Sequence, residues 1–104
     1  MIEALDRAVH DFPFFTNHTY VLALIAQRPD IRMRDIANAV GITERAVQRI
    51  VEDLTVSRCI AVIKSGRRNS YVIQPDSLLH HPMTHHRSIG DLVRFVSPVA
   101  IGAE

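Results

Sequence analysis

A single glycine, Gly41, divides a continuous helical pattern into two short ones. Apolar residues recur at helical spacing over 36–40 before it and over 46–54 after it. Glycine adopts the positive φ that ends a helix at no steric cost, Ile42 can enter the core, and Thr43 can cap the next helix. The sequence therefore predicts two helices that turn at Gly41 and bury their apolar faces against each other.

The second of these helices, expected over about residues 43–57, leaves a polar flank outside its buried face. Long arginine and glutamine side chains reach base edges and phosphates in a DNA major groove, although they are also ordinary on a solvated helix. Nucleic-acid binding is therefore a hypothesis that needs support from neighbouring segments. The outward positions of the flank are Glu44, Arg45, Gln48, Arg49 and Glu52.

Basic residues on either side of this helix support the hypothesis. Arg32 and Arg34 precede the first helix, where positive charge opposes the helix dipole, so phosphate contact explains them better than helix stabilisation. After the second helix, strands are expected at 59–63 and 71–73 around a loop at 64–70. The basic tip of this loop would contact the DNA backbone or minor groove, or else serve only solubility. Its residues are Lys64, Arg67, Arg68 and Asn69.

The positive charge of the chain is concentrated in the same region. The net charge is +1, but residues 28–68 hold nine basic and five acidic side chains, whereas the remainder holds three basic and six acidic. With 104 residues and 47% hydrophobic content, the chain has the size of one folded domain. It contains no apolar run of roughly 20 residues and begins without a basic and then apolar leader, so we expect a cytoplasmic protein without membrane contact.

The segments outside the central unit predict further helices. Terminal helices are expected at about 2–10 and 84–96, the second of them starting from Thr84 or Ser88. A buried central helix is expected from Thr16 or Asn17 to Arg28. A group of neighbouring aromatic residues favours a dimer contact over purely internal packing. These residues are Phe12, Phe14 and Phe15.

Cysteine and histidine are the candidate metal ligands. The lone Cys59 lies in an apolar run, which favours a buried thiol over a reactive or metal-binding one. Four histidines follow the predicted hairpin, and they favour a surface or interface cluster over a metal or pH-sensing site, because Pro82 interrupts their spacing and no carboxylate or thiolate plainly accompanies them. We therefore predict no metal site and no cofactor. The histidines are His80, His81, His85 and His86.

The order of elements resembles the winged helix-turn-helix transcriptional regulators of the broad ArsR and MarR type over about residues 15–96. The most specific segments are 33–54 and 60–73. The resemblance implies one α+β, mostly α, domain over 1–104, with a core at about 15–75, a two-stranded β-wing and flanking N- and C-terminal helices. It also implies a homodimer that is joined through its terminal helices and binds a palindromic operator. The implied DNA contacts are Thr43, Glu44, Arg45, Gln48 and Arg49 on the reading helix, and Arg67, Arg68 and Asn69 on the wing.

We therefore expect a dimeric, sequence-specific regulator of transcription that binds double-stranded DNA. Acidic Glu44 and Glu52 on the reading helix keep a second interpretation open, in which the winged helix is a protein interaction module. Metal-sensing members of the family often carry cysteine pairs, and the lone Cys59 departs from that pattern. An enzyme is disfavoured, because the sequence has no glycine-rich phosphate loop, nucleophile elbow or plausible carboxylate pair.

Overall fold

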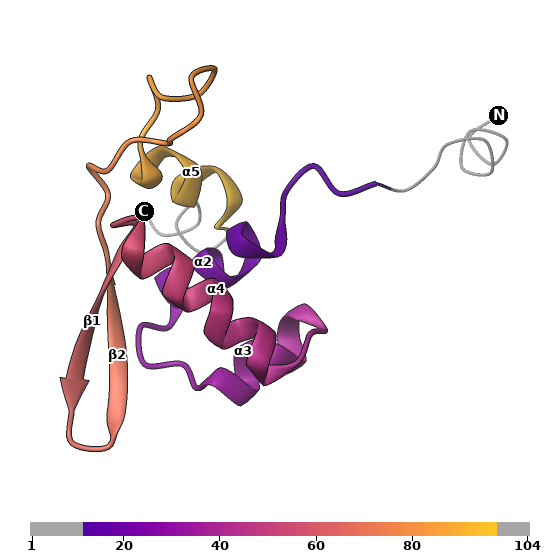
Figure 1. Ribbon diagram of the computed structural model, residues 1–104, viewed down its shortest axis with the longest axis vertical. Helices are drawn as coiled ribbons and strands as arrows, with labels where there is room; N and C mark the ends of the chain where they lie inside the picture. Colours follow the sequence, from indigo (N-terminus) through magenta and orange to yellow (C-terminus); the bar gives the residue numbers. More distant parts are fainter. Residues whose placement is uncertain (1–11, 98–104) are drawn as a thin grey trace, which may run out of the picture.

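The computed structural model describes residues 12–97, so the helix expected at 2–10 lies outside the described residues. Within this range three helices come first, a two-stranded antiparallel hairpin follows, and a further helix comes last (Figure 1). This order confirms the expected mostly helical α+β fold with a two-stranded wing. The elements are α2 (Asn17–Gln27), α3 (Met33–Val40), α4 (Glu44–Val56), β1 (Ile60–Ser65), β2 (Arg68–Ile73) and α5 (Ile89–Val96).

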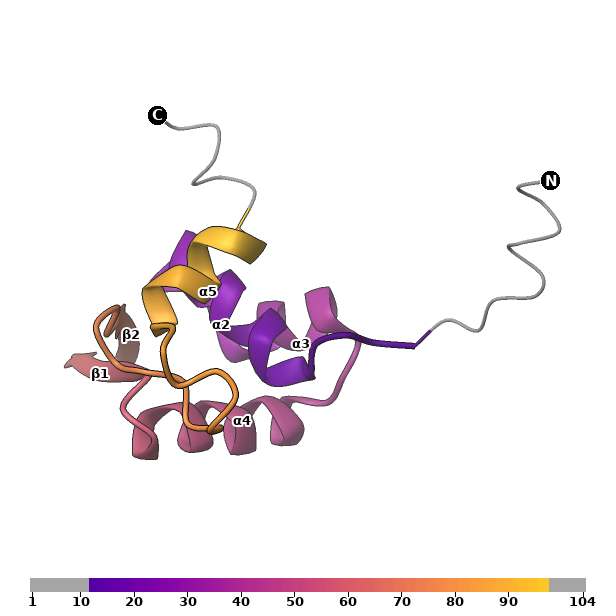
Figure 2. The same cartoon turned by 90° about the horizontal axis from the view of Figure 1, so that it is seen from above.

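Helices α2, α3 and α4 pack around one aliphatic core. Their buried faces are the apolar stripes expected from the sequence, and the hairpin adds Ile60 and Tyr71 to the same cluster. Burial of one large aliphatic side chain contributes about 1.5–3 kcal/mol, so this cluster is the main source of stability. Figure 2 shows α4 along one edge of the molecule, with α2 and α3 to one side of it. The least exposed core side chains are Val21, Leu22, Ile25, Ile36, Val47 and Ile60.

The turn between α3 and α4 has the predicted geometry. Gly41 lies in the left-handed region with φ of 86°, and its N–H donates to the Ala37 carbonyl at 2.8 Å. Ile42 is partly buried against the core. Thr43 occupies the N-cap of α4, where its Oγ1 accepts a hydrogen bond from the Ala46 N–H at 3.1 Å. These local bonds fix how α4 leaves α3.

The strands of the hairpin are longer than expected, and the loop that connects them is shorter. The loop predicted at 64–70 is wrong, because β1 and β2 pair from Ile60 with Ile73 out to Ser65 with Arg68. Only Gly66 and Arg67 connect the strands. Gly66 has φ of 65° at the first of these two positions, which is the requirement of a type II′ turn, and the twist of that turn matches the twist of paired strands.

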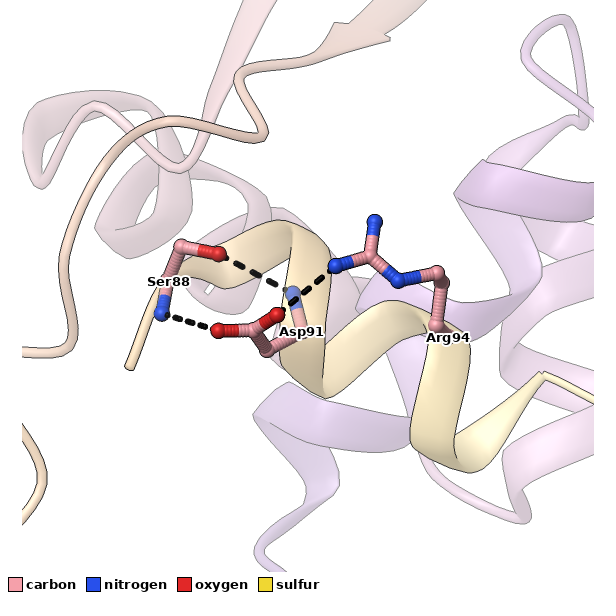
Figure 3. Close-up of polar contacts among 3 residues, drawn as sticks. All are labelled: Ser88, Asp91 and Arg94. Carbon is pink, nitrogen blue, oxygen red and sulfur yellow. Dashed lines mark hydrogen bonds and ion pairs between the residues drawn. The ribbon is translucent and has the colours of Figure 1, made fainter. Parts of the chain in front are cut away.

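Helix α5 begins at the later of the two expected starts. Ser88 rather than Thr84 precedes it, and the first helical residue is Ile89, because Ser88 caps the helix. The Ser88 Oγ accepts from the Asp91 N–H at 3.1 Å, and the Asp91 carboxylate accepts from the Ser88 N–H at 3.0 Å (Figure 3). Residues 84–87 instead belong to a turn-rich loop, which closes where the Leu79 N–H donates to the Arg87 carbonyl at 2.9 Å.

Two close contacts hold α5 against the rest of the domain. The Gly90 N–H donates to the Pro75 carbonyl at 3.0 Å, and a Cβ at Gly90 would lie 3.0 Å from the Pro75 Cβ, so a side chain there would require Pro75 to shift by a few tenths of an ångström. On the other side, the rings of Phe15 and Phe95 meet edge to face at 6.3 Å. The C-terminal helix is thereby joined both to the end of the hairpin and to the segment before α2.

Candidate nucleic-acid interface

The outward flank of α4 lies opposite the buried face of that helix. Every outward position predicted from the sequence is exposed, whereas Val47, Ile50, Val51 and Leu54 face the core. Asp53 is turned toward α2, where its carboxylate meets the His18 Nε2 at 2.8 Å. The exposed flank consists of Glu44, Arg45, Gln48, Arg49 and Glu52.

The residues of this flank and the neighbouring Thr43 differ in how many of their hydrogen-bonding groups already have a partner. Within residues 12–97, the side chains of Arg45, Gln48 and Arg49 make no hydrogen bond or ion pair. Thr43 is partly engaged, because its Oγ1 caps α4, although its hydroxyl proton remains able to donate. Glu44 lies in the first turn of α4, where the helix dipole favours a carboxylate. Arg45, Gln48 and Arg49 are therefore the flank residues with the most donors available for a ligand.

The two arginines expected before the first helix of the pair lie at the N-terminus of α3, and both are exposed, but only Arg32 precedes the helix. Arg32 is the N-cap residue and makes no capping bond with its side chain, and Arg34 lies in the first turn. Asp35 supplies the acidic residue of that turn. Neither arginine has a side-chain partner among residues 12–97, so both guanidinium groups have donors available for a ligand.

The wing residues are exposed, but one of them has an internal partner. Lys64 and Asn69 face each other across the strands, and Arg67 occupies the turn. Arg68 opens β2, and its Nη2 donates to the main-chain carbonyl of Asp30 at 3.1 Å. Arg68 thus spans from the wing to the loop between α2 and α3.

A hollow of about 270 Å³ lies where the wing meets the start of α3. It brings Arg32 together with residues 67–69, which are separated from it by more than thirty positions in the sequence. Arg34, Lys64 and the α4 flank do not line it. The candidate residues therefore form an α4 flank and a separate cationic cleft between α3 and the wing.

One contact beside this cleft was not predicted from the sequence. The Tyr71 N–H donates to the Pro29 carbonyl at 2.9 Å, so the edge of β2 that faces away from β1 is bonded to the loop between α2 and α3. Tyr71 is also buried, in contrast to the polar residues that precede it in β2. In the sequence, the one aromatic residue that follows the polar start of β2 was the signal that this strand contacts the core.

The cysteine and the histidines lie apart from these surfaces. Cys59 is buried, as expected, and burial raises the pKa of its thiol, which disfavours a reactive thiolate. The four clustered histidines are exposed in the loop before α5, which Figure 1 shows at the opposite end of the molecule from the wing tip. His81 Nδ1 accepts from the Met83 N–H at 3.0 Å. In the described part of the chain, His, Cys, Asp and Glu form no group of three suited to a metal ion.

The comparisons agree with this geometry. Residues 21–59 match the family model described as winged helix-turn-helix DNA-binding, and the β1–β2 hairpin follows directly after Cys59. The chain therefore contains a winged helix-turn-helix DNA-binding domain. No curated protein matches the chain. Among the helices between residues 12 and 97, none is long and apolar enough to cross a membrane.

Proposed function

We propose that this winged helix-turn-helix domain belongs to a homodimeric, sequence-specific regulator of transcription. In this proposal α4 enters the major groove of double-stranded DNA, and the wing lies on the backbone or in the minor groove. The observation that carries the proposal is the α4 flank, on which the exposed Arg45, Gln48 and Arg49 have no partner within residues 12–97. Domains of this type are typical of regulators rather than enzymes.

The chemistry of the flank suits base recognition. An arginine guanidinium donates two hydrogen bonds to guanine O6 and N7, and a glutamine amide pairs in the same bidentate way with adenine N6 and N7. Arg45, Gln48 and Arg49 lie within about one helical turn of one another, so one major groove can receive all three. The carboxylates of the exposed Glu44 and Glu52 can accept hydrogen bonds from cytosine N4 and repel phosphate. They therefore restrict the orientation of α4 in the groove.

Phosphate contacts are assigned to basic residues outside α4 and to Asn69. We expect them to position the domain with little dependence on base sequence, and we expect the basic ones to make binding fall steeply with salt. The cationic cleft between α3 and the wing brings the charges of Arg32 and Arg67 together, with Asp30 as the acidic residue in its lining. The proposed phosphate contacts are Arg32, Arg34, Lys64, Arg67 and Asn69.

Dimerisation is assigned to the aromatic residues near the two ends of the described chain. Phe14 and Phe95 are 83% and 75% exposed, Phe12 is also exposed, and none of the four phenylalanines belongs to the buried core. The ring centroids of Phe12 and Phe14 lie 4.9 Å apart, and those of Phe15 and Phe95 lie 6.3 Å apart. Exposed aromatic rings that are paired rather than scattered mark a protein contact. A second copy that covers them would place two α4 helices on a palindromic site.

Selection of bound sites from a random DNA pool tests this function. The expected result is an enriched palindrome whose half-sites are spaced by about one or more helical turns, since each copy contributes one α4. Discrete retarded bands at two salt concentrations would support the same conclusion. A pool that shows no enrichment contradicts sequence-specific binding.

The exposed Glu44 and Glu52 favour a second candidate function, in which the domain binds a protein. Acidic side chains on the reading flank oppose the approach of phosphate, so this face could accept a partner protein with charges of both signs. In that case genomic fragments would give no discrete retarded band at either salt concentration.

A further inference from the structure

Two hydrogen bonds tie the outer edge of β2 to the loop between α2 and α3. The Tyr71 N–H donates to the Pro29 carbonyl at 2.9 Å, and the Arg68 guanidinium donates to the Asp30 carbonyl at 3.1 Å. Arg68 lies three residues nearer the tip than Tyr71, which is roughly 10 Å along a strand. The outermost anchor of the wing is therefore a side chain.

This anchor borders two hollows between the wing and the loop. Asp30, Arg68 and Asn69 line both the hollow that contains Arg32 and Arg67 and a second hollow that contains Ser65 and Ser70. The bond from Arg68 to the Asp30 carbonyl therefore lies where the two hollows adjoin. Because a two-stranded hairpin is marginally stable alone, such a contact strongly affects where the tip lies.

The acceptor of the hydrogen bond from Arg68 is suited to holding the wing in one position. The acceptor is the main-chain carbonyl of Asp30, and the Asp30 carboxylate forms no ion pair within residues 12–97. A main-chain acceptor holds one position, whereas a surface carboxylate moves with its side chain. Arg67 and Asn69, on either side of Arg68, have no such partner in the same residues and remain available to a ligand.

We propose that Arg68 is a positioning residue, which fixes the angle of the wing against the loop between α2 and α3. Arg67 and Asn69, rather than Arg68, then meet the DNA backbone. The DNA part of this inference rests on the proposed function, but the position of the wing in the free protein does not.

Hydrogen exchange of the free protein tests the support directly. Arg68→Ala should accelerate exchange of the Tyr71 amide by roughly tenfold, because the wing loses its outer anchor. Arg67→Ala and Asp30→Asn are matched controls that should leave this rate unchanged, since neither removes the donor or the carbonyl acceptor. An unchanged Tyr71 rate in Arg68→Ala overturns the proposal, whether or not the protein binds DNA.

A double-mutant comparison tests whether Arg67 contacts the DNA backbone while Arg68 only positions the wing. Arg67→Ala should lower the slope of log affinity against log salt by about 0.9, the value for one lost phosphate contact. If Arg68 acts through Arg67, then adding Arg68→Ala to Arg67→Ala leaves that slope unchanged. A further fall of the same size would make Arg68 a phosphate ligand itself and would overturn the proposal.

Discussion

The α3–α4 helix pair and the wing differ in what holds them to the protein. The helix pair is joined through buried side chains such as Ile36, which is fully buried, whereas Ile63 of the wing is 48% exposed. The outer wing is held by strand pairing, one main-chain bond and the guanidinium of Arg68. Tight packing therefore fixes α4 against the core, whereas the position of the wing depends on a few polar contacts.

The largest expected difference between the two regions is in stability. Ile36→Ala should lower the free energy of unfolding by about 2–5 kcal/mol, because it leaves a cavity in the core. Ile63→Ala in β1 should change it by less than about 0.5 kcal/mol, because that side chain is already half exposed. Urea denaturation followed by circular dichroism measures both. Equal losses would mean that the wing is packed as firmly as the helices.

The next difference concerns what each region contributes to DNA binding. Arg45→Ala should cost about 1–3 kcal/mol on the selected site and much less on scrambled DNA, because it removes base contacts. Arg67→Ala should weaken both DNAs equally and reduce the salt dependence. Titrations at several salt concentrations distinguish these patterns. Losses of the same size on both DNAs for Arg45→Ala would exclude base reading by this residue.

A smaller difference is expected between substitutions of the two glycines that have positive φ, Gly41 and Gly66. Gly41→Ala should lower the free energy of global unfolding by about 1–2 kcal/mol, because alanine is strained there and the helix pair cannot relax. The strain of Gly66→Ala should instead be relieved by local opening of the hairpin. Denaturant titration measures the loss of global stability expected for Gly41→Ala, and amide exchange of the wing measures the local opening expected for Gly66→Ala. If Gly66→Ala lowers the free energy of global unfolding more than Gly41→Ala does, the wing is not the less rigid of the two regions.

The smallest expected effect lies in α5 and depends on pH. Its bonds to Ser88 lower the pKa of Asp91 below its ordinary value of 3.8, and the Arg94 guanidinium at 2.7 Å acts in the same direction (Figure 3). A depressed pKa stabilises the folded state above pH 3.8 and loses this contribution as the pH falls through the lowered value.

The stability of α5 should therefore decrease on acidification, as measured by the exchange of its amides at several pH values. Asp91→Asn is the control, because it removes the titrating group. A pH dependence that survives in this variant would have to come from another group.

The α3–α4 unit was predictable from the sequence because its determinants are local. Helical spacing defines both buried faces, and Gly41 and Thr43 mark the turn within two residues of it. The exposed flank of α4 follows from the same spacing, since the positions left outside the buried face must meet solvent. Which bases the flank contacts is a separate matter and stays a prediction.

The wing was less predictable than the helix pair, because its contacts depend on residues that are distant in the sequence. Lys64 and Asn69 have weak strand preference, and only their pairing with each other makes them part of a sheet. The bond from Arg68 to the Asp30 carbonyl joins residues 38 positions apart and has no local signal. Ser88 followed three residues later by Asp91 is, by contrast, a capping pattern that local reasoning can recognise, and it marks the correct start of α5.

The burial of Cys59 gives the protein a built-in reporter of core opening. It is the only thiol in the sequence, and it lies where α4 passes into β1, beside side chains of the central cluster. Because this thiol is buried, we expect a maleimide dye to label it when the junction between α4 and β1 opens, so the labelling rate reports how often that junction opens. The same seclusion shields the sulfur from oxidants while the fold is closed.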